Sequence, residues 1–192
     1  MRTADQAIWN FRYDVPDDIA ARVERLCEQE PKGDPPSRLP AHYHRYLRLL
    51  ALHASVENIR AGPVYMFRRD VLTSEFLISI DQNNADLLRG GFEDWLPDVP
   101  HRQPFKAVVE DGHAVSLCAS VRISDAVHCA GVETLADYRR RGHAVNVVAG
   151  WARAVRALGA VPFYSTSWNN LASCGVAGRL RQPLIAVDFS VS

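Results

Sequence analysis

The segment Ala136–Gly159 reads ADYRRRGHAVNVVAGWARAVRALG, and it places Arg139, Arg140 and Arg141 directly before Gly142. After this glycine, apolar residues recur at helical spacing up to Leu158, and Gly159 is a residue type that commonly ends a helix. The segment therefore predicts a glycine-containing turn that opens a helix from about Gly142 to Leu158.

Such a turn has a specific chemical capability when it leads from a strand into a helix. It directs several free backbone N–H groups to one place, and the helix dipole adds partial positive charge there. Gly142 would let an anion approach the backbone closely, and the small side chain of Ala144 leaves room at the first helical turn. The arginines add positive charge, and each guanidinium group can donate two hydrogen bonds to one phosphate. The pattern indicates a phosphate site, with a solvated surface turn and a nucleic-acid contact as the alternatives.

Composition limits the classes of function. The 192 residues carry 22 basic and 22 acidic side chains, so the formal net charge is zero and the basic excess of a general nucleic-acid or membrane binder is missing. No apolar run is long enough to span a membrane, and the N-terminus lacks the apolar core of a signal peptide. The four cysteines form no CxxC pair, which suits a reducing compartment. We therefore expect a cytoplasmic protein without a nucleic-acid or membrane partner and without a metal.

The first hundred residues predict helices and short strands. Pro16 and the acidic residues after it begin a helix from about Asp17 to Glu28. A proline-rich loop over 31–40 follows. Further predictions are a helix within 41–59, strands within 61–69 and 75–81, and a helix within 84–96.

From Phe105 onward the pattern becomes rich in strands. Two runs within 105–123 are joined around Asp111-Gly112, a strong hairpin signal. A strand over 126–134, the helix after Gly142, a strand over 161–168, a helix over 169–180 and a strand over 184–191 complete the order β-β-β-α-β-α-β. A strand–helix–strand crossover must bring two strands parallel, so the sheet is expected to be mixed.

The turn and its flanks resemble a known family. Arg139–Ala144, RRRGHA, matches the R/Q-x-x-G-x-G/A pattern of the GCN5-related N-acetyltransferases (GNATs), and PFYSTSWNNLAS over 162–173 resembles the next strand and the N-x-A-S helix start of that family. The resemblance covers about 104–173. It implies an α/β fold with a mixed, largely antiparallel sheet, splayed at the central parallel strand pair, and helices on both faces.

The same resemblance implies a domain organisation and a co-substrate. A mostly helical N-terminal segment over 1–62 would precede an acetyltransferase domain over 63–192, best supported over 104–192. Acetyl-CoA would bind with its pyrophosphate on the turn and its pantetheine arm along the preceding strand. The implied binding residues are Val132, Thr134, Arg139, Arg140, Arg141, Gly142, His143, Ala144, Asn170 and Ser173. The alternative for Asn170 is a helix N-terminal cap, and the same residue could both cap the helix and bind the cofactor.

Catalytic groups are less well defined by the pattern. Direct attack of an amine on a thioester benefits from a general base and an acid. Alternation places His128 and Glu133 on opposite faces of one strand, and both are candidate bases. Tyr164 is the candidate acid, because the last core helix lacks the tyrosine that many relatives carry there. Each of the three is also compatible with a purely structural role.

The resemblance implies an acetyl-CoA-dependent N-acetyltransferase that acts on a primary amine, expected to be that of a small molecule, in a ternary complex, and it leaves a homodimer open. Two other functions remain: a non-catalytic acyl-CoA-binding or sensing module of the same fold, and a nucleic-acid-binding adaptor that uses the arginine turn. Transfer to an amine distinguishes the first, and steep salt dependence of nucleic-acid binding distinguishes the second.

Overall fold

A computed structural model describes residues 1–33, 37–68 and 76–192. These residues form two compact units, each built from stretches that are separate in the sequence. Unit 1 contains Met1–Tyr65, Ser165–Leu171 and Leu184–Ser192, and unit 2 contains Met66–Tyr164 and Ala172–Pro183. The predicted domain boundary at residue 62 stays a prediction. No helix among the described residues is both long and apolar enough to cross a membrane.

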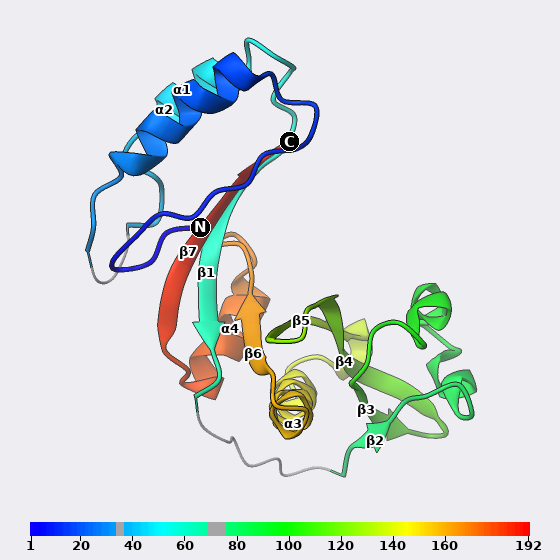
Figure 1. Cartoon of the computed structure of the whole chain (residues 1–192). Coiled ribbons are helices and arrows are strands. Elements are labelled where there is room, and N and C mark those ends of the chain that lie inside the picture. Colours follow the sequence, from blue (N-terminus) through cyan, green and yellow to red (C-terminus); the bar gives the residue numbers. More distant parts are fainter. Residues whose placement is uncertain (34–36, 69–75) are drawn as a thin grey trace. The chain divides into compact units, whose positions relative to one another are not determined.

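Unit 2 is built on a mixed sheet with the strand order β2-β3-β4-β5-β6 (Figure 1). The strands are β2 (Ile78–Ser79), β3 (Phe105–Glu110), β4 (His113–Ile123), β5 (Val127–Thr134) and β6 (Val161–Ser165). Neighbouring strands are antiparallel except for β5 and β6, which are parallel. The mixed α/β class is therefore confirmed.

Helices cover both faces of this sheet. Helix α3 (His143–Ala157) packs on β3, β4 and β5, and α4 (Leu171–Leu180) follows β6 in the chain. The other face carries two 3₁₀ helices, η1 (Ala85–Leu88) and η2 (Glu93–Asp98). Leu88 of η1 and Phe92, the residue directly before η2, are buried and share one core with Phe105, Leu117 and other residues of β3 and β4.

The parallel pair β5 and β6 separates after three residue pairs. Val127, His128 and Cys129 pair with β6, and the pairing ends there. A β-bulge in β4 lies between Ser120 and Arg122, directly opposite this point of β5. Because a bulge increases the local strand twist, it turns β5 away from β6 at the residue where their pairing ends. The predicted splay of the sheet is thus confirmed and has a local cause.

Glycines with positive φ lie at the turns that the sequence predicted. Asp111 and Gly112 both have positive φ, 49° and 81°, as a two-residue hairpin turn requires. Gly142, with φ 99°, precedes α3, and Gly159, with φ 84°, follows it. The predicted bounds of this helix are confirmed to within one residue.

The predicted helix over 84–96 is wrong as a single α-helix. It is divided into η1 and η2 by Gly90 and Gly91, whose φ values are 97° and 146°. Their N–H groups donate to the Glu93 carboxylate at 2.7 and 3.0 Å, which stabilises the break. The sequence pattern therefore predicted the apolar residues of this segment correctly and its helix type incorrectly.

Unit 1 joins two helices to an antiparallel strand pair (Figure 1). Helix α1 (Asp17–Glu28) has the predicted bounds, whereas α2 (Tyr43–Leu50) is shorter than its predicted range. Strands β1 (Ile59–Met66) and β7 (Leu184–Val191) pair along their lengths. Phe189 of β7 packs on Tyr43 and Tyr46 of α2 and so attaches the helices to the strands.

Glu30, which follows α1, is hydrogen-bonded to residues at the start of α2. Its carboxylate accepts hydrogen bonds from the N–H groups of Ala41 and His42 and from the Tyr46 hydroxyl. It also lies 3.7 Å from a guanidinium nitrogen of Arg2, and the two side chains are only 3% and 8% exposed. Burial and the Glu30 charge both raise the pKa of Tyr46, which keeps that hydroxyl protonated as a donor.

The first prediction concerns this buried carboxylate. Glu30→Ala should lower the free energy of unfolding by about 3 kcal/mol, because it leaves Arg2 buried without its counter-charge. Urea denaturation followed by circular dichroism measures the loss. Glu28→Ala, an exposed glutamate at the end of α1, should change stability by less than about 0.5 kcal/mol. Equal losses in both variants would contradict the role of Glu30.

Candidate functional site

The arginine turn connects β5 to α3 within unit 2. A 3₁₀ turn, η3 (Ala136–Tyr138), is followed by Arg139 in an extended conformation and Arg140 with φ 63°. Gly142 then adopts a left-handed conformation as the residue that caps α3. A side chain at Gly142 would meet no atom within 4 Å, so the space beside this glycine is open.

Backbone N–H groups converge at this turn. Within the described chain, the N–H groups of Arg140, Arg141, Gly142 and Ala144 have no backbone acceptor, whereas those of Val145 and Asn146 donate to the Gly142 carbonyl. The helix dipole of the 15-residue α3 adds partial positive charge at the same end. This arrangement can bind an anionic group through main-chain donors.

The three arginines have different surroundings. Arg139 donates from Nε to the Thr134 carbonyl at 3.2 Å. Arg141 donates to the Asp137 carbonyl at 3.0 Å, and its guanidinium carbon lies 4.8 Å from the centre of the Tyr138 ring. Arg140 is exposed, and its side chain has no partner within the described chain. Arg140 is therefore the arginine whose guanidinium is available to a ligand.

Glu110, at the end of β3, contacts two side chains of the arginine turn. Its two carboxylate oxygens lie 3.6 Å from Arg141 Nη1 and 3.2 Å from His143 Nε2. The His143 side chain is 7% exposed, so its imidazole is directed into the protein. Only the backbone of His143 is thus suited to face a ligand at the turn.

Strand β5 leads to the turn with one edge unpaired. Its other edge pairs with β4, where Val132 is opposite Cys118 and Thr134 is opposite Ser116. From Ala130 to Thr134, no described strand pairs with the edge that β6 has left. Backbone N–H and C=O groups there can bind an extended ligand as a strand would.

Glu133 lies on the face of β5 that η1 and η2 cover. Its exposed carboxylate accepts a hydrogen bond from Trp95 Nε1 of η2 at 2.8 Å, through Oε2. Trp95 also packs against Phe105 and beside Gly131. The indole therefore fixes the direction of a carboxylate that belongs to an exposed residue.

His128 lies on the opposite face, beneath α3. Its Nδ1 is 2.9 Å from Ser120 Oγ, and Trp151 Nε1 donates to the same oxygen at 3.0 Å. Because Ser120 accepts from Trp151, its own hydrogen can be donated to Nδ1 of a neutral imidazole. Burial lowers the pKa of His128, in agreement with a neutral ring.

The remaining candidates divide between the two units. In unit 2, the buried hydroxyl of Tyr164 is hydrogen-bonded to the side chain of Ser173, so a candidate acid and a candidate binding residue are in contact. In unit 1, Asn170 lies in the loop before α4, and its N–H donates to the Ser167 carbonyl at 3.1 Å.

Val132 and Thr134 thus lie on the strand that leads into the turn residues Arg139 to Ala144. His128 and Glu133 lie on opposite faces of that strand. Sequence reasoning did not identify two supporting residues, Trp95 and Glu110. Trp95 is 38 positions from Glu133 and gave no sequence signal. Glu110 precedes the Asp111-Gly112 hairpin turn, and only the register of β3, β4 and β5 brings it to the arginine turn.

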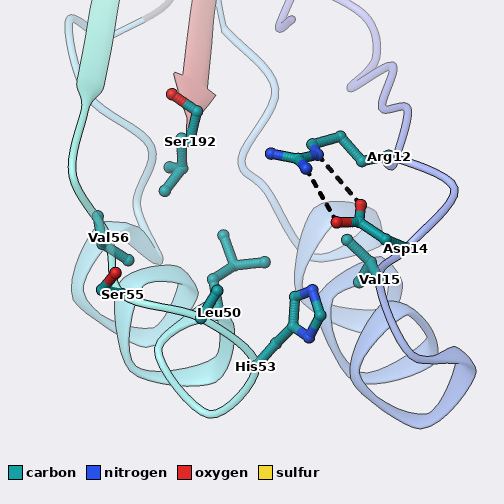
Figure 2. A pocket seen from close by; sticks show the side chains of 10 residues that line it. Arg12, Asp14, Val15, Leu50, His53, Ser55, Val56 and Ser192 are labelled. Atoms are coloured by element: carbon teal, nitrogen blue, oxygen red, sulfur yellow. Dashed lines mark hydrogen bonds and ion pairs between the residues drawn. The ribbon is translucent and has the colours of Figure 1, made fainter.

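A pocket in unit 1 was not expected from the sequence (Figure 2). It has a volume of about 110 Å³ and is lined by His53, Val56 and Ser192, among others. Arg12 and Asp14 form a two-pronged ion pair at its edge, at 3.1 and 2.9 Å. The volume is below the ~300 Å³ at which ligand sites usually begin, and its charges are already paired.

Comparisons with solved structures identify the fold. A GCN5-related N-acetyltransferase-like protein from Streptococcus suis aligns over 77% of this chain with a TM-score of 0.57 and 17% identity. A GCN5-related N-acetyltransferase from Sphaerobacter thermophilus aligns over 79% with a TM-score of 0.53 and 15% identity. An acetyltransferase from the GNAT family of Colwellia psychrerythraea aligns over 79% with a TM-score of 0.52 and 14% identity.

The chain therefore has the fold of the GNAT proteins, as its sequence motif implied. It spans 68%, 57% and 63% of the lengths of these three proteins, respectively. No protein-family model matches the sequence, and no curated protein is similar to it at the sequence level. At such identities the likeness shows the fold alone.

The second prediction uses the buried histidine. Because burial lowers the pKa of folded His128, the unfolded chain binds more protons once the pH falls below the ordinary histidine value of about 6.5. Wild-type stability should therefore fall between about pH 7.5 and about pH 5.5, by up to about 1 kcal/mol per pH unit from this group.

Urea titrations at these two pH values test the prediction. His128→Gln should have lower stability at about pH 7.5 and a smaller loss on acidification. His44→Gln, which removes an exposed histidine on α2, serves as the control and should keep the wild-type pH dependence. The same acid loss in wild type and His128→Gln would show that His128 does not contribute it.

Proposed function

We propose that this chain, which has the GNAT fold, is an acetyl-CoA-dependent N-acetyltransferase that acts on a primary amine. One observation carries the proposal. Within the described chain, the N–H groups of Arg140, Arg141, Gly142 and Ala144 have no backbone acceptor, and they follow the edge of β5 that no described strand pairs with. Main-chain donors and an open strand edge suit a ligand that has a pyrophosphate at one end and an extended amide-containing arm.

The residues of the turn fit the phosphate end of acetyl-CoA. Gly142 offers open space where a side chain would otherwise stand, and Arg140 supplies an exposed guanidinium. Arg139 and Arg141 stay bound to the protein and would act mainly by shaping the turn. The backbone around Val132 and Thr134 would hold the arm, with Ser173 of the same unit as a further contact. The role that the sequence implied for Asn170 stays a prediction.

The chemistry follows from the proposed binding mode. Acetyl-CoA would supply an acetyl group as a thioester. An amine that has lost a proton would attack the thioester carbonyl, so that an amide C–N bond forms, the C–S bond breaks and coenzyme A leaves as a thiolate that takes up a proton. Glu133 is the better candidate base, because its carboxylate is exposed and oriented by Trp95, whereas His128 is buried beneath α3. Tyr164 is a weaker candidate acid, because its hydroxyl is buried and hydrogen-bonded to Ser173.

The acceptor is proposed to be a small molecule. An exposed carboxylate at Glu133 attracts a protonated amine before it accepts the proton, so one group can both bind and activate the acceptor. The rival, a module that binds acyl-CoA without transfer, shares the same turn. It differs only in having no acceptor, which makes transfer the deciding measurement.

The third prediction tests the co-substrate site. Gly142→Glu should abolish acetyl-CoA binding measured by isothermal titration calorimetry, because it puts a negative charge where the pyrophosphate would lie. Gly159→Glu is the matched control: it has the same substitution, a positive φ and open surroundings, but it lies at the other end of α3. It should bind acetyl-CoA as wild type does. No wild-type binding at about 1 mM would reject the proposal.

The fourth prediction tests the base. Glu133→Gln should lower kcat/KM by about 10²–10⁴-fold and leave acetyl-CoA affinity unchanged, because it removes proton acceptance but keeps the hydrogen bond from Trp95. Thiol release during a screen of amino acids, polyamines and aminoglycosides measures the rate.

Asp94→Asn, an exposed carboxylate on η2, is the control for this substitution and should keep full activity. Full activity in Glu133→Gln would exclude Glu133 as the base. Tight acetyl-CoA binding by wild type without transfer to any amine in the screen would favour the acyl-CoA-binding module.

A further inference from the structure

A groove of about 490 Å³ lies between α1 and α2 in unit 1. Four arginines line it, Arg22 and Arg25 from α1 and Arg45 and Arg48 from α2. All four side chains are exposed. The groove is far from neutral although the whole chain has no net charge, because none of the described residues that line it is acidic.

These arginines differ from others on the surface. Arg12, Arg89 and Arg102 each pair with a nearby aspartate at 2.7–2.9 Å. Within the described chain, none of the four groove arginines forms an ion pair. Helix α1 contains acidic residues at positions 17, 18, 24 and 28, yet none of them lines the groove. Four unneutralised like charges around one groove repel one another and attract an anion.

Their spacing is regular. The two arginines on each helix are three residues apart, which puts their Cβ atoms about 5–6 Å apart on one face. Packed helices lie about 8–10 Å apart, so the four guanidinium groups surround the groove from two sides. Each guanidinium offers a planar fork that matches a carboxylate.

The other residues that line the groove indicate what kind of anion fits. They are Leu26, Leu49 and Gln29, and none of the described lining residues is aromatic. Single-stranded nucleic acids are held on aromatic stacking platforms along a charged track, and the described lining of this groove offers no such platform. A short peptide needs only clustered carboxylates, a few backbone bonds to a group such as the Gln29 amide, and modest apolar contact.

We propose that the four-arginine groove docks an acidic peptide segment of a partner protein. The inference does not depend on the acetyltransferase proposal, because all lining residues belong to unit 1 and none belongs to the arginine turn. The segment would carry several carboxylates close together and would bind chiefly by charge-assisted hydrogen bonds. Its affinity should therefore fall as salt rises.

Fluorescence anisotropy with a labelled hexaglutamate peptide tests the groove in the full chain. Replacing Arg22 and Arg25 by Gln, or Arg45 and Arg48 by Gln, should weaken binding by about tenfold or more. The matched control replaces Arg122 and Arg179 by Gln. These two exposed arginines of unit 2 change the net charge equally and should alter binding by less than about twofold. Circular dichroism confirms that each variant is folded.

Three results would overturn the proposal. The first is no binding of hexaglutamate to wild type at about 1 mM peptide and low salt. The second is an equal loss in the control pair, which would show a response to net charge alone. The third is tighter binding of labelled hexathymidine that both groove variants abolish, which would assign the groove to nucleic acid instead.

Discussion

The early separation of β5 from β6 is the constraint on which the candidate site depends. Their pairing ends at Cys129, opposite the bulge in β4. Gly131 preserves this geometry, because a side chain there would come within 2.2 Å of Val121 Cγ1. From Ala130 to Thr134 no described strand pairs with the edge of β5 that β6 has left, so its backbone groups are available to a ligand, and the strand leads directly into the arginine turn. The bulge in β4 therefore leaves one edge of β5 without a strand partner after Cys129.

Contacts with Glu110 and with backbone carbonyls determine how much positive charge the arginine turn presents to a ligand. One carboxylate is close to both Arg141 and His143, which fixes the start of α3 and neutralises part of the cationic cluster. Arg139 is bound to a main-chain carbonyl. The potential offered to a ligand therefore comes from Arg140, the free N–H groups and the helix dipole, rather than from three equivalent arginines.

Local signals in the sequence predicted most elements of the fold. Pro16, the Asp111-Gly112 turn, Gly142 and Gly159 each impose a backbone conformation, so their neighbouring helices and strands have the expected bounds. The helix over 84–96 was wrong because two adjacent glycines outweighed the apolar periodicity. The contacts of Glu133 with Trp95 and of Glu110 with His143 could not be predicted, because they join residues that are distant in sequence.

The two candidate bases on β5 lie on opposite faces of the strand, and one is buried whereas the other is exposed. His128 belongs to a hydrogen-bonded group with Ser120 and Trp151, where protonation would be costly and an acceptor could not enter. Glu133 stands on the other face, exposed but held in one direction by an indole N–H. A base needs access to the amine and a fixed orientation together. Of the candidate bases on β5, only the carboxylate of Glu133 combines the two, so in the proposed transferase an acceptor amine would approach from the face that carries η1 and η2.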